Sequence, residues 1–266
     1  MQKNAVTYCS TVGVVAAFSL FFRWIQNQAA FETDTGLMIA GAFWSKLALV
    51  VCLISLAAIV LMVRALWYKG YYPAQNYTDM IKGKQEWLRR ITRGIAGVMV
   101  FGTAICFFIA GYSVYSTMLR TLCVLAIAAA WAFVKLSEVP FAEKKSELKQ
   151  TVYVGIIAAM YVYWLIVSYR TNSANPSVWN YAVEIFAICA SILGTFYFAS
   201  YAFENPRPYA ALGCLMTGAF LSLVSLLDDR NIGMTIMLVA GAAMQLYFVW
   251  MIISSMSEEW PEEYYE

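Results

Sequence analysis

The chain has 266 residues, of which 62% are hydrophobic and only 13% are charged, and its formal net charge is +2. Soluble globular domains are closer to half apolar and a quarter charged, so this composition excludes an ordinary soluble domain. The sequence contains no histidine. That excludes histidine-based nucleophile pairs, zinc sites of the H-E-x-x-H type and histidine-ligated haem.

Long apolar stretches follow one another along the chain. Several exceed the roughly 18 residues that mark a membrane-spanning helix, whereas a transmembrane β-barrel would show alternating segments of about ten residues. The sequence therefore predicts an all-α integral membrane protein with a single transmembrane domain, residues 1–266, built as a polytopic bundle of about eight helices. We expect the spans near residues 6–25, 37–63, 94–112, 118–136, 151–169, 181–203, 210–227 and 234–255.

The first and fifth spans open in a similar way, with "VGVVAA" at residues 12–17 and "VGIIAA" at residues 154–159. Two parallel four-helix repeats, residues 1–136 and 151–256, would explain this likeness. The alternative is chance, because alanine, glycine, valine and isoleucine dominate any membrane helix.

The lysine and arginine residues are distributed unevenly between the two sides of the predicted bundle. Seven lie in the 64–93 connection and four in the 135–150 connection, whereas the connections on the opposite side carry only four in total. Because short basic loops stay in the cytoplasm, the sequence predicts a multi-pass plasma-membrane protein with both termini cytoplasmic.

Two charged residues are interpreted as lying clearly within the predicted spans, Lys46 in "GAFWSKLALV" and Glu184 in "YAVEIFAICA", whereas Arg23 and Arg120 are assigned to the outer side. A charged side chain at the centre of a membrane helix costs about 2.5–3.5 kcal/mol, so such residues usually have a partner or a function. Both helices are predicted to enter from the outer side, which places Lys46 roughly 13 Å below residue 37. We hypothesise that Lys46 and Glu184 pair with each other.

This pair has two interpretations. In the functional one, it is the outward-facing polar site of a small-molecule or ion permease, or of a ligand-binding membrane protein. Lys46 would then hold an anionic group, and Glu184 a cation or a proton. In the structural one, the pair is a salt bridge that fixes helix register, or each residue reaches the headgroups by itself.

The predicted outer connections contain two further acidic pairs, Glu32 with Asp34 and Asp228 with Asp229. Paired carboxylates can bind cations or act as acid and base, but they are equally ordinary as solvated loop residues. The six cysteines stand singly, without a C-x-x-C spacing, so no metal site is expected. No catalytic residue and no cofactor are predicted.

The 64–93 loop is basic, and its residues 78–93 are predicted to form an amphipathic helix on anionic headgroups. Its candidate residues for binding lipid or a partner are Lys82, Lys84, Trp87, Arg89, Arg90 and Arg93. The acidic tail, residues 257–266, lies on the same side and is hypothesised to fold onto this loop.

The basic loop and the acidic tail support an alternative function, a non-catalytic membrane subunit or regulator. Its partner would be another membrane protein or a second copy of the chain. Nucleic acid is not an expected partner, because the basic residues are juxtamembrane.

Overall fold

The computed structural model describes residues 2–32, 37–39, 41–74, 77, 80, 85–110, 116–138, 146–173, 181–203, 205–228 and 230–256. Almost all of them are helical. The long helices are α1 (Gln2–Ala29), α2 (Phe43–Tyr68), α4 (Gln85–Ile109), α5 (Ser116–Leu136), α6 (Ser146–Asn172), α7 (Ala182–Ala199), α8 (Pro208–Val224) and α9 (Ile232–Ser255). Short 3-10 segments extend α7 (Ser200–Phe203) and α8 (Ser225–Leu227). Within the described ranges, eight helices are long and apolar enough to cross a membrane, which confirms the predicted all-α polytopic bundle.

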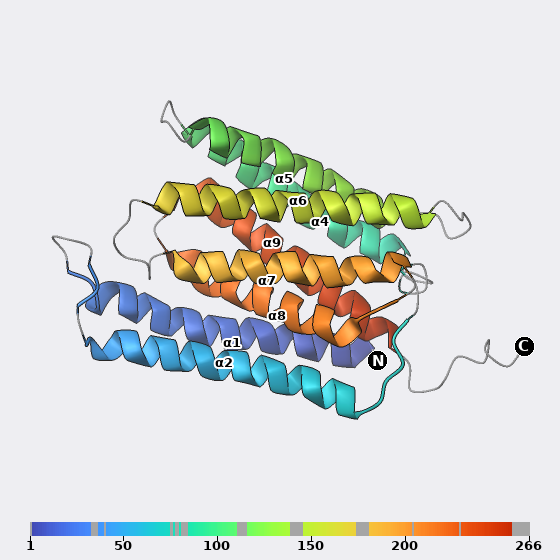
Figure 1. Ribbon diagram of the computed structural model, residues 1–266, viewed down its shortest axis with the longest axis horizontal. Helices are drawn as coiled ribbons and strands as arrows, with labels where there is room; N and C mark the ends of the chain where they lie inside the picture. Colours follow the sequence, from blue (N-terminus) through green and yellow to red (C-terminus); the bar gives the residue numbers. More distant parts are fainter. Residues whose placement is uncertain are drawn as a thin grey trace, which may run out of the picture.

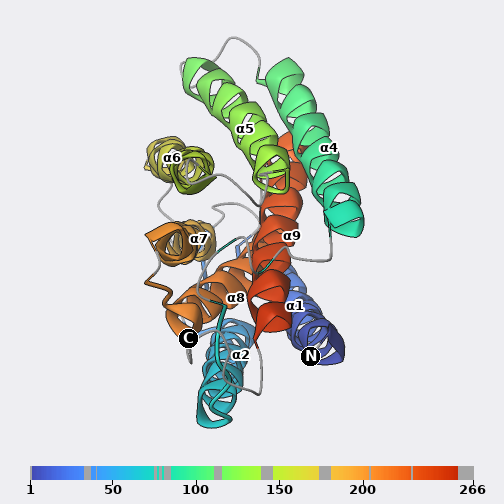
Figure 2. The ribbon, with the colours of Figure 1, turned by 90° about the vertical axis from the view of Figure 1, so that its right-hand side faces the viewer.

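The helices lie side by side with their long axes roughly aligned (Figure 1). The start of α1 and the end of α9 lie at one end of the bundle, which we call the proximal end. The connections α1–α2, α4–α5, α6–α7 and α8–α9 lie at the other end, the distal end. Viewed along the bundle, α9 runs through the middle, between the α4–α5 pair and the α1–α2 pair (Figure 2).

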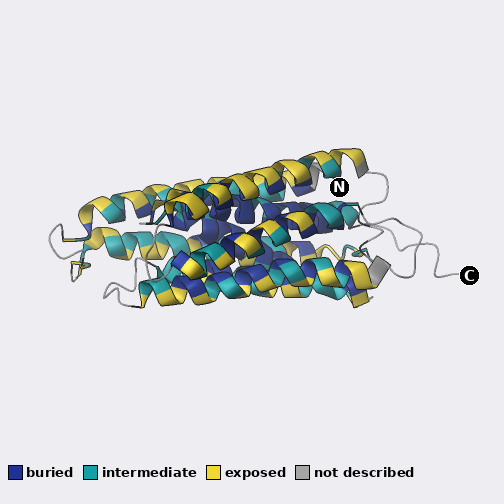
Figure 3. Cartoon of the chain, turned by 90° about the horizontal axis from the view of Figure 1, so that it is seen from above, coloured by how far each residue is buried: buried dark blue, intermediate teal, exposed yellow. Residues whose placement is uncertain are grey.

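The core is built around α9, which packs against α1, α4 and α8. Glycines allow α4 and α9 to approach closely: a Cβ on Gly102 would lie 2.9 Å from Ile236 Cγ2, and one on Gly233 would collide with the backbone of Cys106. Small residues have this role at membrane helix contacts, because they let the backbones meet. The outward faces of the helices are exposed and largely apolar, as a lipid-facing surface requires (Figure 3).

Two helix boundaries at the distal end differ from those expected, and both affect the charged residues. Helix α1 continues to Ala29 instead of ending near residue 25, and α2 begins at Phe43 instead of near residue 37. Between them the chain forms a small hairpin, in which the Ile39 N–H donates to the Ala30 carbonyl over 2.9 Å. Local backbone pairing thus ends the helices where apolar composition alone suggested a longer second span.

The amphipathic helix expected at residues 78–93 is, from Gln85 onward, the first part of the spanning helix α4. Leu88 is fully buried and Trp87 is exposed, so this part does have an inner and an outer face. The acidic tail, residues 257–266, lies outside the described residues. The internal repeat stays a prediction.

Candidate functional site

Four charged side chains from separate parts of the chain meet at the distal end. Arg23 comes from α1, Glu184 from the first turn of α7, and Asp228 and Arg230 from the α8–α9 connection. Arg23 Nη2 lies 2.9 Å from Asp228 Oδ1, and Arg230 Nη2 lies 3.4 Å from both Asp228 Oδ2 and Glu184 Oε2. All four side chains are at most 6% exposed. We call these residues the four-charge cluster.

The four-charge cluster contains two cations and two anions, so its formal charges cancel. An isolated buried charge would cost several kcal/mol, and opposite charges at this distance offset much of that cost. The Arg23 Nε–H also donates to Asp228 Oδ1 over 2.9 Å, which fixes the guanidinium against the carboxylate. The cluster therefore joins α1, α7 and the α8–α9 connection through buried side chains of opposite charge.

Glu184 has different partners from the one hypothesised. Its Oε2 is paired with Arg230, and its Oε1 accepts a hydrogen bond from Trp164 Nε1 of α6 over 3.1 Å. Among the described residues, no acidic side chain forms an ion pair with Lys46, which is exposed. The alignment of the two proposed repeats suggested this pairing, but the helix ends place the two residues in different surroundings.

Lys46 lies in the first turn of α2, because that helix begins at Phe43. Three residues of helix correspond to about 4.5 Å, so Lys46 is much nearer the helix end than the 13 Å expected. A lysine there can extend its flexible stem toward the headgroups. Its presence in an apolar run therefore requires no buried partner.

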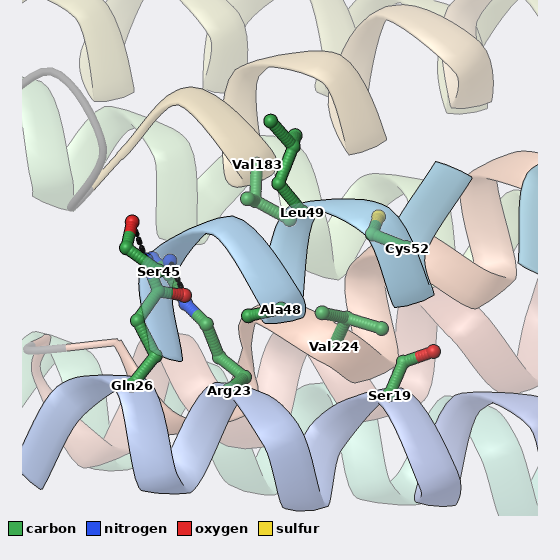
Figure 4. A pocket seen from close by; sticks show the side chains of 9 residues that line it. All are labelled: Ser19, Arg23, Gln26, Ser45, Ala48, Leu49, Cys52, Val183 and Val224. Carbon is green, nitrogen blue, oxygen red and sulfur yellow. Dashed lines mark hydrogen bonds between the residues drawn. The ribbon is translucent and has the colours of Figure 1, made fainter. Parts of the chain in front are cut away.

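A small pocket opens beside the four-charge cluster, between α1, α2 and α8, with polar side chains on one side and an otherwise apolar lining (Figure 4). Its volume is about 50 Å³. Arg23 and Gln26 reach from α1 toward Ser45 on α2: Arg23 Nη1 donates to Gln26 Oε1 over 2.9 Å, and Gln26 Nε2 donates to Ser45 Oγ over 3.2 Å. The pocket is therefore bordered by one guanidinium and a chain of polar groups.

A larger apolar groove continues from this pocket. It lies between α2 and α7, with α8 as its floor, and has a volume of about 720 Å³. The pocket and the groove share three lining residues, Leu49, Cys52 and Val183, so the two are contiguous. Almost all the groove's side chains are apolar, and several of them are exposed on the outer surface of the bundle.

The groove follows one face of α2. Its lining residues on that helix are Leu49, Cys52, Leu53, Leu56 and Val60, which are related by steps of three and four and therefore share one helical face. Lys46 precedes Leu49 by three residues and extends the same face toward the distal end. From Leu49 to Val60 the groove covers about 16 Å of helix, at 1.5 Å per residue.

A second polar network lies deeper in the bundle. Gln245 of α9 donates from Nε2 to Ser191 Oγ of α7 over 2.7 Å and to the Tyr161 hydroxyl of α6 over 3.2 Å. Gly218 of α8 has no side chain, and the Gln245 amide occupies the space where a Cβ on Gly218 would lie. This network connects four elements of the core and is separate from the pocket and the groove.

None of the remaining candidate residues that the structure describes belongs to this site. Glu32 is exposed in the α1–α2 hairpin, and Asp34, Asp229, Lys82 and Lys84 lie outside the described residues. No group of three metal-binding side chains occurs among the residues that were placed. The site therefore brings together Asp228 and Glu184 of the predicted set, with Lys46 at its edge.

At the proximal end, Trp87 of α4 packs edge-on against Trp250 of α9, with ring centroids 4.9 Å apart. Arg90 is exposed, Arg89 is partly buried, and Arg93 lies 3.3 Å from Glu138. Trp87 and Trp250 also line a groove of about 400 Å³ between α1, α4 and α9. These residues form a surface of their own, far from the distal site.

Three residues of the site were not among the predicted candidates. Arg23 lies near the end of the first expected span, Arg230 lies between the last two, and Trp164 is one of several aromatic residues in the fifth. Helix α1 continues to Ala29 and so extends past the expected end near residue 25. Arg23 therefore lies within the bundle and not at its surface. Nothing in the sequence pattern indicated the contact of Trp164 with Glu184.

No family model, no curated protein and no solved structure matches this chain. The function is therefore inferred from the geometry of the pocket, the groove and the charges around them.

Proposed function

We propose that this membrane protein binds an amphiphilic small molecule, as a binding protein or a permease, at the distal pocket and groove. The observation that carries the proposal is that a pocket bordered on one side by the polar groups of Arg23, Gln26 and Ser45 is continuous with an apolar groove between α2 and α7. A molecule with a polar head and an apolar chain matches both parts. Neither a purely polar solute nor an inorganic ion would use the groove.

The dimensions support such a ligand. The groove volume of about 720 Å³ lies within the usual range for small-molecule sites, about 300–1,000 Å³. Its length along α2, about 16 Å, is close to half of the roughly 30 Å hydrocarbon thickness of a bilayer. The ligand's chain would therefore lie parallel to the lipid chains of one leaflet and reach the site sideways from the bilayer.

The four-charge cluster gives the site a fixed wall. Its ion pairs hold α1, α7 and the α8–α9 connection together next to the pocket. In this proposal the cluster positions Arg23 and does not itself carry the ligand. A permease would additionally need a movement of α2 or α7 that opens the groove toward the other leaflet.

The proposed orientation follows the positive-inside rule. The proximal end carries the basic connections and would face the cytoplasm of a plasma-membrane protein, so the pocket would open toward the outer leaflet. At the proximal end, exposed Arg90 and the groove beside Trp87 favour contact with anionic lipids. The same surface could bind a partner chain, so a non-catalytic regulatory subunit is the second candidate function.

The test of the main proposal compares substitutions at two glycines where the structure has open space for a side chain. Gly213 lies on the groove floor and Gly155 lies on α6, away from the groove, and a Cβ at either position meets no atom within 4 Å. Tryptophan at residue 213 would fill the groove, whereas tryptophan at residue 155 would only enlarge a lipid-facing surface. Native mass spectrometry of protein released from mild detergent measures the amphiphiles that stay bound.

We expect wild type and Gly155→Trp to retain a bound amphiphile and Gly213→Trp to lose it. If Gly213→Trp retains the same molecules in the same amount, the groove is not the binding site and the proposal is wrong. If wild type retains none under conditions that keep the bundle folded, the proposal is wrong as well.

A further inference from the structure

The exposed ammonium group of Lys46 is the feature of the site that amphiphile binding alone does not explain. Lys46 continues the groove-lining face of α2 by one helical step beyond Leu49. It also follows Ser45, which lines the pocket. Lys46 itself lines neither the pocket nor the groove, but it lies one helical step from Leu49 toward the end of α2, where its flexible stem can reach the distal end of the groove.

The ion pairs of the four-charge cluster do not include Lys46. Arg23 and Arg230 are balanced by Asp228 and Glu184 within the four-charge cluster. None of the ion pairs between described residues joins Lys46 to an acidic side chain. A ligand with one negative charge would therefore balance Lys46 without disturbing the cluster.

The pocket also limits the size of the ligand's head. A volume of about 50 Å³ admits a few water molecules at most, since a water's share of the liquid is about 30 Å³. A carboxylate is of this size, whereas a phospholipid headgroup with its glycerol is much larger. A carboxylate accepts hydrogen bonds and donates none, which suits a pocket lined by the donors of Arg23 and Gln26, with Lys46 next in the chain to Ser45.

We propose that the ligand is a long-chain carboxylic acid in its ionised form, with the carboxylate at Lys46 and the pocket and the chain along the groove. This inference rests on the proposed function and specifies the ligand class for the same site. Lys46 selects the charge, and the groove accepts the chain. A neutral amphiphile of equal length would occupy the groove with lower affinity.

The experiment uses the full chain in phosphatidylcholine nanodiscs at mildly alkaline pH, where the acid is ionised. The two probes are palmitic acid with a photoreactive diazirine in its chain and the alcohol of the same chain. After irradiation, labelled peptides are identified by mass spectrometry. The variant is Lys46→Gln, and the matched control is Lys69→Gln, which removes an exposed lysine at the opposite end of α2.

We expect the acid to label peptides of α2, α7 and α8 more strongly than the alcohol does. An exposed ion pair contributes at most about 1 kcal/mol, which corresponds to up to about five-fold in affinity. Lys46→Gln should abolish this preference and leave alcohol labelling unchanged, which also shows that the variant is folded. Lys69→Gln should behave as wild type does.

The two proposals fail in different ways. Equal labelling of the groove by acid and alcohol in wild type, or an unchanged preference in Lys46→Gln, overturns the carboxylic-acid inference and leaves amphiphile binding intact. Absence of groove labelling by both probes, while other lipid-facing peptides are labelled, overturns the proposed function itself.

Discussion

At the residue scale, the unusual feature is the burial of Arg23, Glu184, Asp228 and Arg230 at one end of the bundle. Their charges cancel, and Trp164 completes the hydrogen bonding of Glu184. Arg230 is satisfied less well, because no described acceptor meets its Nε and Nη1 atoms. Its importance for stability should therefore come from the two carboxylates that it neutralises.

A double-mutant cycle of Glu184→Gln and Arg230→Met tests this account. Each single change leaves an uncompensated buried charge in the cluster and should lower the free energy of unfolding by about 3 kcal/mol. The double variant should lose less than the sum, with an interaction free energy of at least about 1 kcal/mol. Reversible unfolding in mixed detergent micelles measures all four proteins.

Lys46→Gln is the control in this cycle, because Lys46 is exposed and outside the cluster. Its effect on the free energy of unfolding should stay within about 0.5 kcal/mol and should add to that of Glu184→Gln. Strict additivity of Glu184→Gln and Arg230→Met, or coupling of Lys46→Gln with Glu184→Gln, would contradict the assignment of partners.

At the element scale, the bundle depends on the close approach of α4 and α9. Gly233 meets the backbone of Cys106, and Gly102 meets Ile236, with no room for a side chain at either glycine. This contact holds the α4–α5 pair against the central helix. The contact requires glycine at residue 233, because the nearest atoms belong to the backbone of Cys106 and cannot move away from a new Cβ as a flexible side chain could.

Gly233→Ala should lower the free energy of unfolding by about 1–3 kcal/mol, the usual cost of overpacking. The matched control is Gly97→Ala on α4, where a Cβ meets no atom within 4 Å. Alanine there should cause no loss, because it is the better helix former. Equal stability of the two variants in the same unfolding assay would show that α4 and α9 are further apart than described.

Much of the helical organisation is predictable from the sequence, because apolar length decides whether a segment can cross a bilayer. Each of the eight expected spans overlaps one long helix. The ends are less predictable: residues 37–39 are apolar enough for a span, yet they pair with residues 30–32. A hydropathy pattern does not contain this backbone pairing, and the error moved Lys46 too deep.

The site is less predictable than the helices. Lys46, Glu184 and Asp228 stood out as charges in or beside apolar runs, but their partners depend on how the helices rotate and pack. The groove arises because α8 lies behind both α2 and α7, and a single sequence does not contain that arrangement. Trp164 is found only through its contact with Glu184.

At the scale of the whole molecule, the two ends of the bundle have different characters. The distal end holds the four-charge cluster and the polar pocket, and the proximal end holds both termini of the described chain and the most basic connections (Figure 1). This asymmetry is the basis for the proposed orientation, with the proximal end in the cytoplasm.

The orientation is tested with single cysteines introduced into a cysteine-free variant. Ser173→Cys lies at the distal end of α6 and Lys69→Cys at the proximal end of α2, and both positions are exposed. A membrane-impermeant maleimide added to intact cells should label residue 173 only, and residue 69 should react after permeabilisation. The reverse pattern would place the pocket in the inner leaflet.

The central claim is that the groove between α2 and α7 is a ligand site open to the bilayer. A cryo-electron microscopy map of the protein in lipid nanodiscs, with a rigid antibody fragment bound to enlarge the particle, tests it most directly. The account predicts elongated density along Leu49, Leu53 and Gly213 that ends beside Ser45 and Lys46. A map in which α2 packs directly on α7, with no space between them, would contradict it.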